Sequence, residues 1–118
     1  MKIWCGNFLQ EVLEKKGYHV ITAVDGKAGL KTYGEQRSKI DLIISDIGLP
    51  IMNGIELFER LIVAYPEVKV IIASGYIEPD KKSDLLSRGL KAFIQKPYRP
   101  SEAWTRVREA LDAPLATD

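Results

Sequence analysis

The chain has 118 residues, of which 46% are apolar and 28% charged, with 17 Lys and Arg against 16 Asp and Glu. This length predicts one domain with a single layered core, and the composition excludes wholesale disorder. The formal net charge of +1 argues against a dominant surface for nucleic acid or anionic membrane, and a lone cysteine, Cys5, excludes an internal disulfide and a cysteine-cluster metal site.

Membrane and export signals are absent from the sequence. The longest stretch free of Asp, Glu, Lys and Arg runs from Ile47 to Ile55, far short of the roughly 18–20 residues that a membrane span needs. The first residues lack the long apolar run of a signal peptide. We therefore expect a cytoplasmic protein with no membrane partner, and the low cysteine content favours the same compartment.

Short runs rich in β-branched and aromatic residues alternate with amphipathic segments along the chain. The runs predict strands at Tyr18–Ala23, Ile40–Ser45, Val68–Ala73 and Lys91–Gln95. The amphipathic segments predict helices at Phe8–Lys16, Gly29–Gln36, Asn53–Ala64, Pro79–Arg88 and Ser101–Leu111. The second and third strands are apolar on both faces, which is typical of central strands in a covered parallel sheet. The last helix begins with Ser101, a residue type that favours the N-cap position.

Strands that are separated by single helices predict right-handed crossovers and an open, doubly wound α/β domain, whose working site lies at the carboxyl ends of the strands. Polar residues follow three of these ends: Asp46, Ser74 and Lys96. An exposed carboxylate can act as a nucleophile, and a neighbouring lysine and hydroxyl can bind the oxygens of a phosphoryl group. The same residues also fit ordinary loops, in which Asp46 caps a turn, Ser74 opens one and Lys96 is solvated.

The residues from Asp46 to Gly54 (DIGLPIMNG) resemble the D-x-x-L-P-x-M-x-G segment of response-regulator receiver domains, the phosphoacceptor modules of two-component signalling. Further matches follow the family's order at Gly17-Tyr18, Ala23-Val24-Asp25-Gly26, Ser74-Gly75-Tyr76 and Phe93-Ile94-Gln95-Lys96-Pro97-Tyr98. The resemblance extends over roughly 8–112 and implies a flavodoxin-like, doubly wound parallel sheet of five strands. We expect the receiver domain to occupy residues 1–112 and a frayed tail to occupy 113–118.

The resemblance also assigns roles to individual residues. Asp46 would be the phosphoacceptor that attacks a phosphohistidine, Ser74 and Lys96 would contact the phosphoryl group, and Phe93 would be the switch aromatic. The expected Mg²⁺ ligands are Asp46 and the backbone carbonyl of Gly48.

The resemblance implies partners as well. A histidine kinase or a histidine phosphotransfer protein would donate the phosphoryl group. The last helix and last strand would bind a downstream protein or a second copy, with no direct nucleic-acid partner. Arg99, Arg106 and Arg108 either belong to that contact or form a solvated face.

The chain departs from the family near its N-terminus, where receivers have an apolar strand that ends in two adjacent acids. Those acids help to hold Mg²⁺. Here the first acidic residue is Glu11, and roughly a dozen residues of the family pattern are missing before Gly17. We expect Lys2-Ile3-Trp4-Cys5 to act as a short surrogate strand, with Gly6-Asn7 as the turn after it. Strand exchange with a second copy is the alternative. Mg²⁺ binding is expected to be weak or absent, and phosphorylation impaired.

The resemblance therefore implies a signalling domain that is not an enzyme and that is similar to the receivers appended to hybrid sensor kinases. A phosphorylation-independent interaction module on the same fold is the first alternative. A small aspartyl-nucleophile phosphatase is the second, although no further acid follows Asp46 within several residues. A flavin or nucleotide carrier is disfavoured, because the chain lacks a Gly-rich phosphate loop after its first strand.

Overall fold

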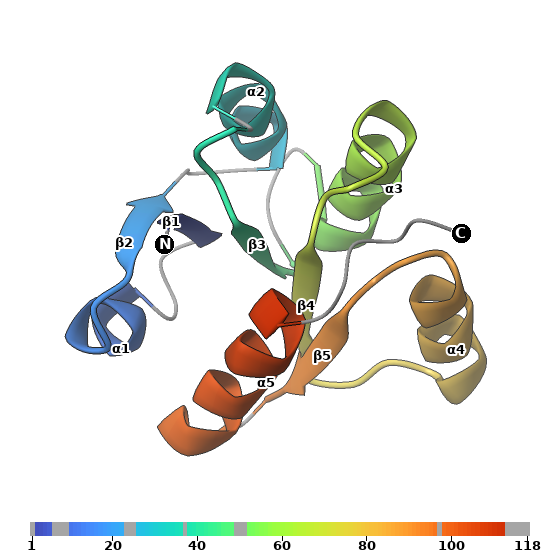
Figure 1. Ribbon diagram of the computed structural model, residues 1–118. Helices are drawn as coiled ribbons and strands as arrows, with labels where there is room; N and C mark the ends of the chain where they lie inside the picture. The colour runs from blue at the N-terminus through green and yellow to red at the C-terminus, as the bar shows by residue number, and fades with distance from the viewer. Residues whose placement is uncertain are drawn as a thin grey trace.

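Five strands and five helices alternate along the described part of the chain (Figure 1). The structure is a computed structural model that describes residues 2–5, 10–22, 26–36, 38–48, 52–96 and 98–112. The strands are β1 (Lys2–Cys5), β2 (His19–Thr22), β3 (Leu42–Asp46), β4 (Val70–Ser74) and β5 (Ala92–Gln95). The helices are α1 (Gln10–Lys15), α2 (Gly26–Gln36), α3 (Gly54–Ala64), α4 (Pro79–Ser87) and α5 (Pro100–Asp112). The expected order of elements is therefore confirmed.

All five strands pair in parallel, in the order β2-β1-β3-β4-β5. This order is the flavodoxin-like one, and it brings the carboxyl ends of all strands to one edge of the sheet. Asp46 pairs in register with Ala73, and Ser74 with Gln95. The residues that follow β3, β4 and β5 in sequence consequently meet at that edge.

The surrogate first strand is confirmed. The segment Lys2–Cys5 forms β1, which lies between β2 and β3, with Ile3 in register with Val20 on one side and Leu42 on the other. Ile3 is fully buried, so the chain supplies its own central strand and does not need strand exchange to complete the sheet. The expected turn at Gly6-Asn7 and the expected tail at 113–118 lie outside the described residues.

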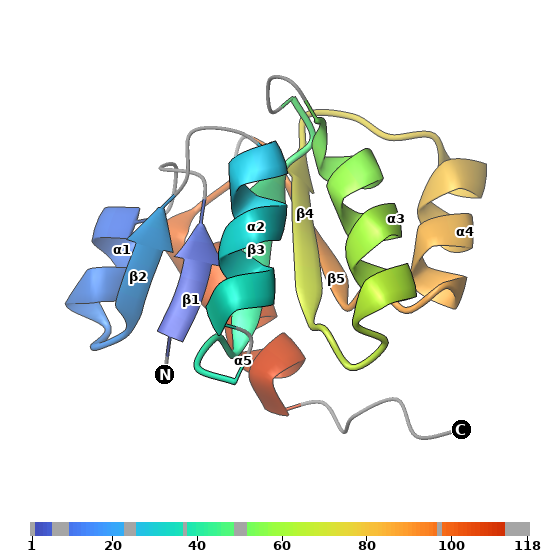
Figure 2. The ribbon, with the colours of Figure 1, turned by 90° about the horizontal axis from the view of Figure 1, so that it is seen from above.

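Helices cover both faces of the sheet, as Figure 1 shows: α1 and α5 lie on one face, and α2, α3 and α4 on the other. Figure 2 shows the second group side by side. β3 and β4 are buried almost throughout, because each strand packs against both helical layers. On one face Val107 and Leu111 of α5 pack on the sheet, and on the other Phe58 of α3 does so.

Three predicted helix starts within the described residues differ from the structure. α3 begins at Gly54, with Asn53 as its N-cap. α2 begins at Gly26 instead of Gly29, and α5 begins at Pro100, so Ser101 is inside the helix and is not its N-cap. Proline fits the first turn because its fixed φ is already helical and its missing N–H would have no partner there. The carbonyl of Ser101 accepts a hydrogen bond from the Thr105 hydroxyl at 2.9 Å.

The arginines of α5 are not equivalent. Arg99, just before the helix, and Arg106 are exposed, as a solvated face requires. Arg108 instead donates a hydrogen bond to the Tyr18 hydroxyl at 2.8 Å, and its Cζ atom lies 5.9 Å from the centroid of the Trp104 ring. It therefore joins α5 to the segment after the short helix α1. Within the described part of the chain, no helix is both long and apolar enough to cross a membrane.

Candidate functional site

Asp46 is the last residue of β3, at the carboxyl edge of the sheet. Its side chain is 26% exposed, so the carboxylate is accessible without being fully solvated. The backbone N–H of Gly48 donates to Asp46 Oδ1 at 2.8 Å, and the ammonium of Lys96 contacts Oδ2. The carboxylate is thus held between a backbone donor and a cation, with part of its surface open to a reaction partner.

Lys96 reaches Asp46 from two strands away, and its backbone fixes its position. The N–H of Lys96 donates to the carbonyl of Ser74 at 2.8 Å, which extends the pairing of β4 with β5 by one residue. The lysine side chain is 35% exposed. An ion pair in such a setting contributes little to stability. The contact therefore matters for the charge of the site, where Lys96 balances Asp46, more than for the stability of the fold.

Ser74 ends β4 and is buried, with its neighbour Ala73 in register with Asp46. Its hydroxyl donates to the backbone carbonyl of Tyr76 at 2.9 Å, within its own loop. Asp46, Ser74 and Lys96 lie at one edge of the sheet, as the sequence predicted. No feature of the sequence indicated that the Ser74 hydroxyl donates to its own loop. A phosphoryl contact by Ser74 requires the hydroxyl to leave Tyr76.

Gly54, the first residue of α3, lies against the backbone that positions Asp46. Its N–H donates to the carbonyl of Ile47 at 3.1 Å. A β-carbon on Gly54 would approach the carbonyl oxygen of Asp46 to 2.7 Å and the hydroxyl oxygen of Ser45 to 3.0 Å. The glycine of the D-x-x-L-P-x-M-x-G pattern is therefore needed because α3 begins in direct contact with the end of β3.

Replacing Gly54 with Ala is expected to lower the free energy of unfolding by about 1–3 kcal/mol, because the methyl group overpacks a backbone contact. Urea unfolding followed by circular dichroism measures the change. Gly75→Ala is the matched control on the same edge, since a β-carbon there would meet nothing within 4 Å. Equal stability of the two variants would show that the backbone of β3 yields without cost.

Metal ligands are sparse at this edge. No group of three or more His, Cys, Asp or Glu side chains gathers anywhere among the residues that the structure describes. Of the expected ligands, Asp46 already accepts a hydrogen bond from the Gly48 N–H on Oδ1 and the contact with the Lys96 ammonium on Oδ2.

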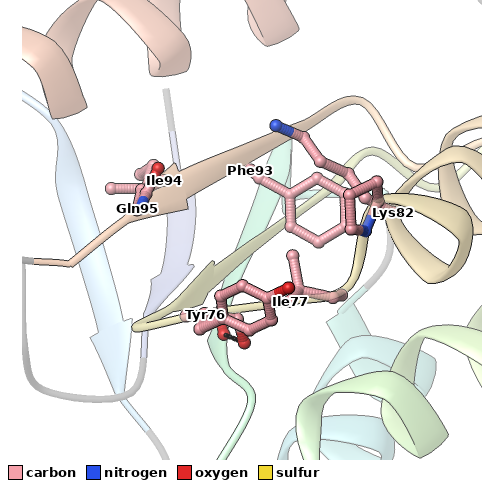
Figure 3. A pocket seen from close by; sticks show the side chains of 8 residues that line it. Tyr76, Ile77, Lys82, Phe93, Ile94 and Gln95 are labelled. Atoms are coloured by element: carbon pink, nitrogen blue, oxygen red, sulfur yellow. Dashed lines mark hydrogen bonds between the residues drawn. The ribbon is translucent and has the colours of Figure 1, made fainter.

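Phe93 lies on β5 and is half-buried beside α4. A hollow of about 330 Å³ runs from Phe93 to Ser74 and is also lined by Tyr76 and Ile77 (Figure 3). Lys82 of α4 reaches over the Phe93 ring, with its Nζ 5.7 Å from the ring centroid. The sequence did not single out Lys82, because nothing distinguishes it from other exposed helical lysines.

Comparison with known proteins shows similarity over nearly the whole chain. A family model described as the response regulator receiver domain matches residues 5–108. The chemotaxis protein CheY of Thermotoga maritima is 33% identical over 105 residues, which are 88% of this chain and 82% of that protein. The sensor kinase CckA of Brucella abortus is 31% identical over 100 residues, or 85% of this chain.

The structural comparison gives the same fold. A complex of CheX and CheY with BeF₃ and magnesium from Borrelia burgdorferi contains a chain with a TM-score of 0.87 and 24% identity, which covers 95% of this chain and 89% of that one. Relatives differ greatly in length: the chain spans only 11% of the Brucella sensor kinase and 16% of the Arabidopsis thaliana regulator ARR13.

Proposed function

The chain belongs to the response regulator receiver domain family of two-component systems, and on this premise we propose that Asp46 accepts a phosphoryl group from a phosphohistidine. The observation that supports this proposal is the contact between the partly exposed carboxylate of Asp46 and the ammonium of Lys96. A carboxylate that is both open and paired with a cation can attack phosphorus while the cation balances the charge of the incoming oxygens.

The proposed transfer needs few groups. A carboxylate oxygen of Asp46 forms the new P–O bond as the P–N bond of phosphohistidine breaks. The imidazole nitrogen keeps the electron pair of that bond and takes up a proton. Lys96 then stays close to the added phosphoryl oxygens, while the Ser74 hydroxyl exchanges the Tyr76 carbonyl for one of them. That exchange would couple the charge on Asp46 to the loop after β4 and to Phe93.

Magnesium does not fit the residues present. Mg²⁺ requires near-octahedral oxygen ligands and is usually held through carboxylates. Glu11 is the first acidic residue of the chain, so neither β1 nor residues 6–9 can supply a carboxylate. Among the described residues, Asp46 is the acid that remains as an expected ligand together with the Gly48 carbonyl, and we expect Mg²⁺ affinity to be weak. The related Borrelia complex contains magnesium, but no step in this chain is assigned to a metal.

Charge balance at the edge explains why acceptance of a phosphoryl group can survive without the metal. Asp46 and Lys96 together are neutral, whereas two further acids would leave an excess of negative charge for a cation to cancel. An anionic donor therefore meets no net repulsion from this pair. It also loses the stabilisation that a divalent ion gives to the transferring group, so the transfer is expected to be slow.

The proposed partners and role are those that the family suggests. A histidine kinase or histidine phosphotransfer protein would donate the phosphoryl group, and β5 with α5 would bind a downstream protein or a second copy. The role is that of a signalling domain and not of an enzyme, with no direct nucleic-acid contact. We place the receiver domain at residues 1–112 and the chain in the cytoplasm.

Labelling with acetyl phosphate tests this function. Intact-mass spectrometry is expected to detect slow gain of one phosphoryl group per chain, at a rate that changes little between millimolar Mg²⁺ and EDTA, because the edge lacks the acids that would bind the metal. Rapid and complete labelling that depends on millimolar Mg²⁺ would contradict the proposed metal deficiency. Absence of labelling with acetyl phosphate and with phosphohistidine donors would contradict acceptance itself.

A phosphorylation-independent interaction module is the second candidate, and the missing acidic pair is the observation that favours it. In that case the Asp46–Lys96 contact would be a fixed part of the fold. Partner binding would then be identical for the wild type and an Asp46→Asn variant, with or without a phosphodonor. A binding difference between these states supports the switch.

A further inference from the structure

A hollow of about 620 Å³ lies between α2 and α3, two helices that Figure 2 shows side by side. It is larger than the hollow of about 330 Å³ beside Phe93. We call it the α2–α3 groove, and its lining combines apolar and charged side chains: Leu30, Glu56, Glu59, Arg60, Val63, Ala64 and Tyr65. The proposed phosphoryl transfer uses none of these residues, so the groove is a separate surface.

The apolar part of the groove is exposed at its rim and fixed at its wall. Val63 is 81% exposed, the largest exposed fraction of any large apolar side chain among the described residues. The Tyr65 ring meets the Tyr33 ring edge-on, with 5.2 Å between the centroids, and a β-carbon on Gly34 would lie 2.7 Å from the Tyr65 hydroxyl oxygen. Because Tyr65 is already held in place, an occupant of the groove does not have to order it, which lowers the entropic cost of binding.

The charges that line the groove change sign along α3. Glu56 and Glu59 lie toward the N-terminal end of the helix, whereas Arg60 and Val63 lie toward its C-terminal end. Glu59 is paired with Arg88 of α4 at 3.0 Å. Glu56 and Arg60 form no ion pair with any residue that the structure describes. One acid and one base, a single turn apart, are therefore available to an occupant.

We propose that the α2–α3 groove binds a second copy of this chain, with the two α3 helices antiparallel about a two-fold axis. Arg60 of each copy then faces Glu56 and Glu59 of the other, and Val63 of each copy enters the groove of the other. The order of charges along α3 selects this direction, because parallel helices would place like charges opposite each other. Each contact occurs twice, as a two-fold interface requires.

This self-association goes beyond the proposed function and differs from the contact proposed for β5 and α5. The helix α5 covers the opposite face of the sheet from α2 and α3 (Figure 1). One helix and one groove from each copy form a small interface, and interfaces below roughly 1,200 Å² are typically weak and transient. We therefore expect a dimer that forms only at high protein concentration, without a phosphodonor and without any reaction at Asp46.

Sedimentation velocity on the full chain, from micromolar to millimolar concentration, measures this association. The sedimentation coefficient of the wild type is expected to rise with concentration. Arg60→Glu and Glu56→Arg are each expected to weaken association by about tenfold or more, because each reversal brings like charges together at two symmetric positions. An equimolar mixture of the two variants is expected to associate like the wild type, since opposite charges then face each other again. Recovery in the mixture also shows that both variants are folded.

Further variants distinguish this surface from others. Lys81→Glu makes the same change in net charge at an exposed site on α4 and is expected to leave association unchanged. Val63→Ser keeps every charge and is expected to weaken association severalfold, whereas Leu86→Ser, at a side chain 41% exposed on α4, is not. A wild type that stays monomeric at millimolar concentration would overturn the proposal. So would a dimer that resists Arg60→Glu but is lost in Arg106→Glu, because its contact would then be on α5.

Discussion

Asp46→Asn is expected to abolish phosphoryl labelling of the chain while leaving the fold intact. The amide has nearly the shape of the carboxylate, and its oxygen still accepts the hydrogen bond that Gly48 donates to Oδ1 at 2.8 Å. It is, however, a poor nucleophile and has no negative charge for Lys96 to balance. Because Asp46 is 26% and Lys96 35% exposed, loss of the ion pair is expected to change the free energy of unfolding by about 1 kcal/mol or less.

Asp41→Asn is the matched control for this variant. Asp41 is exposed and immediately precedes β3, so it lies at the opposite end of the strand from Asp46. The two substitutions each remove one carboxylate from an end of β3, but only one removes it from the candidate site. Intact-mass spectra after acetyl phosphate treatment are expected to show no adduct on Asp46→Asn and wild-type labelling on Asp41→Asn. An adduct of undiminished yield on Asp46→Asn would place the acceptor elsewhere.

The edge of the sheet that contains Asp46, Ser74 and Lys96 could be predicted from the sequence, because parallel strands have a simple geometry. The apolar runs before Asp46 and Ser74 fixed which strands are central, and the carboxyl ends of parallel strands share an edge. Spacing alone still allowed ordinary loops at these positions. The ion pair between Asp46 and Lys96 shows that two of these side chains meet, and it depends on side-chain positions fifty residues apart.

Other features had no local signal in the sequence. Ser101 is a residue type that favours the N-cap position, but α5 begins one residue earlier, at Pro100, because the fixed φ of proline suits the first turn of a helix. The close contact of Gly54 with the carbonyl of Asp46 depends on where α3 meets β3. The position of Lys82 over Phe93 depends on how α4 lies beside β5. The last two of these are set by tertiary packing, which periodicity and residue type do not encode, whereas the start of α5 is set by its neighbour Pro100.

The second large effect is expected from restoring the acidic pair. Gly6 and Asn7 directly follow β1, whose last residue, Cys5, is in register with Ile44 of β3, two residues before Asp46. Gly6→Asp together with Asn7→Asp would add two carboxylates directly after β1 in the sequence, and the carboxyl end of β1 lies at the edge that contains Asp46. A divalent ion about 4 Å from one added charge gains about 2 kcal/mol even at the dielectric constant of water, or about 30-fold in affinity for each acid.

The double variant is therefore expected to bind Mg²⁺ measurably by calorimetry, to gain thermal stability in proportion to Mg²⁺ concentration, and to be labelled faster by acetyl phosphate with Mg²⁺ than with EDTA. Ser38→Asp with Lys39→Gln changes the net charge by the same amount in the exposed turn before β3, at the opposite edge, and is expected to do none of these. The contrast separates a local ligand effect from a change in overall charge. If both variants remain as insensitive to Mg²⁺ as the wild type, then the missing acids do not explain the metal deficiency, and the contact of Lys96 with Asp46 becomes the feature that excludes the ion.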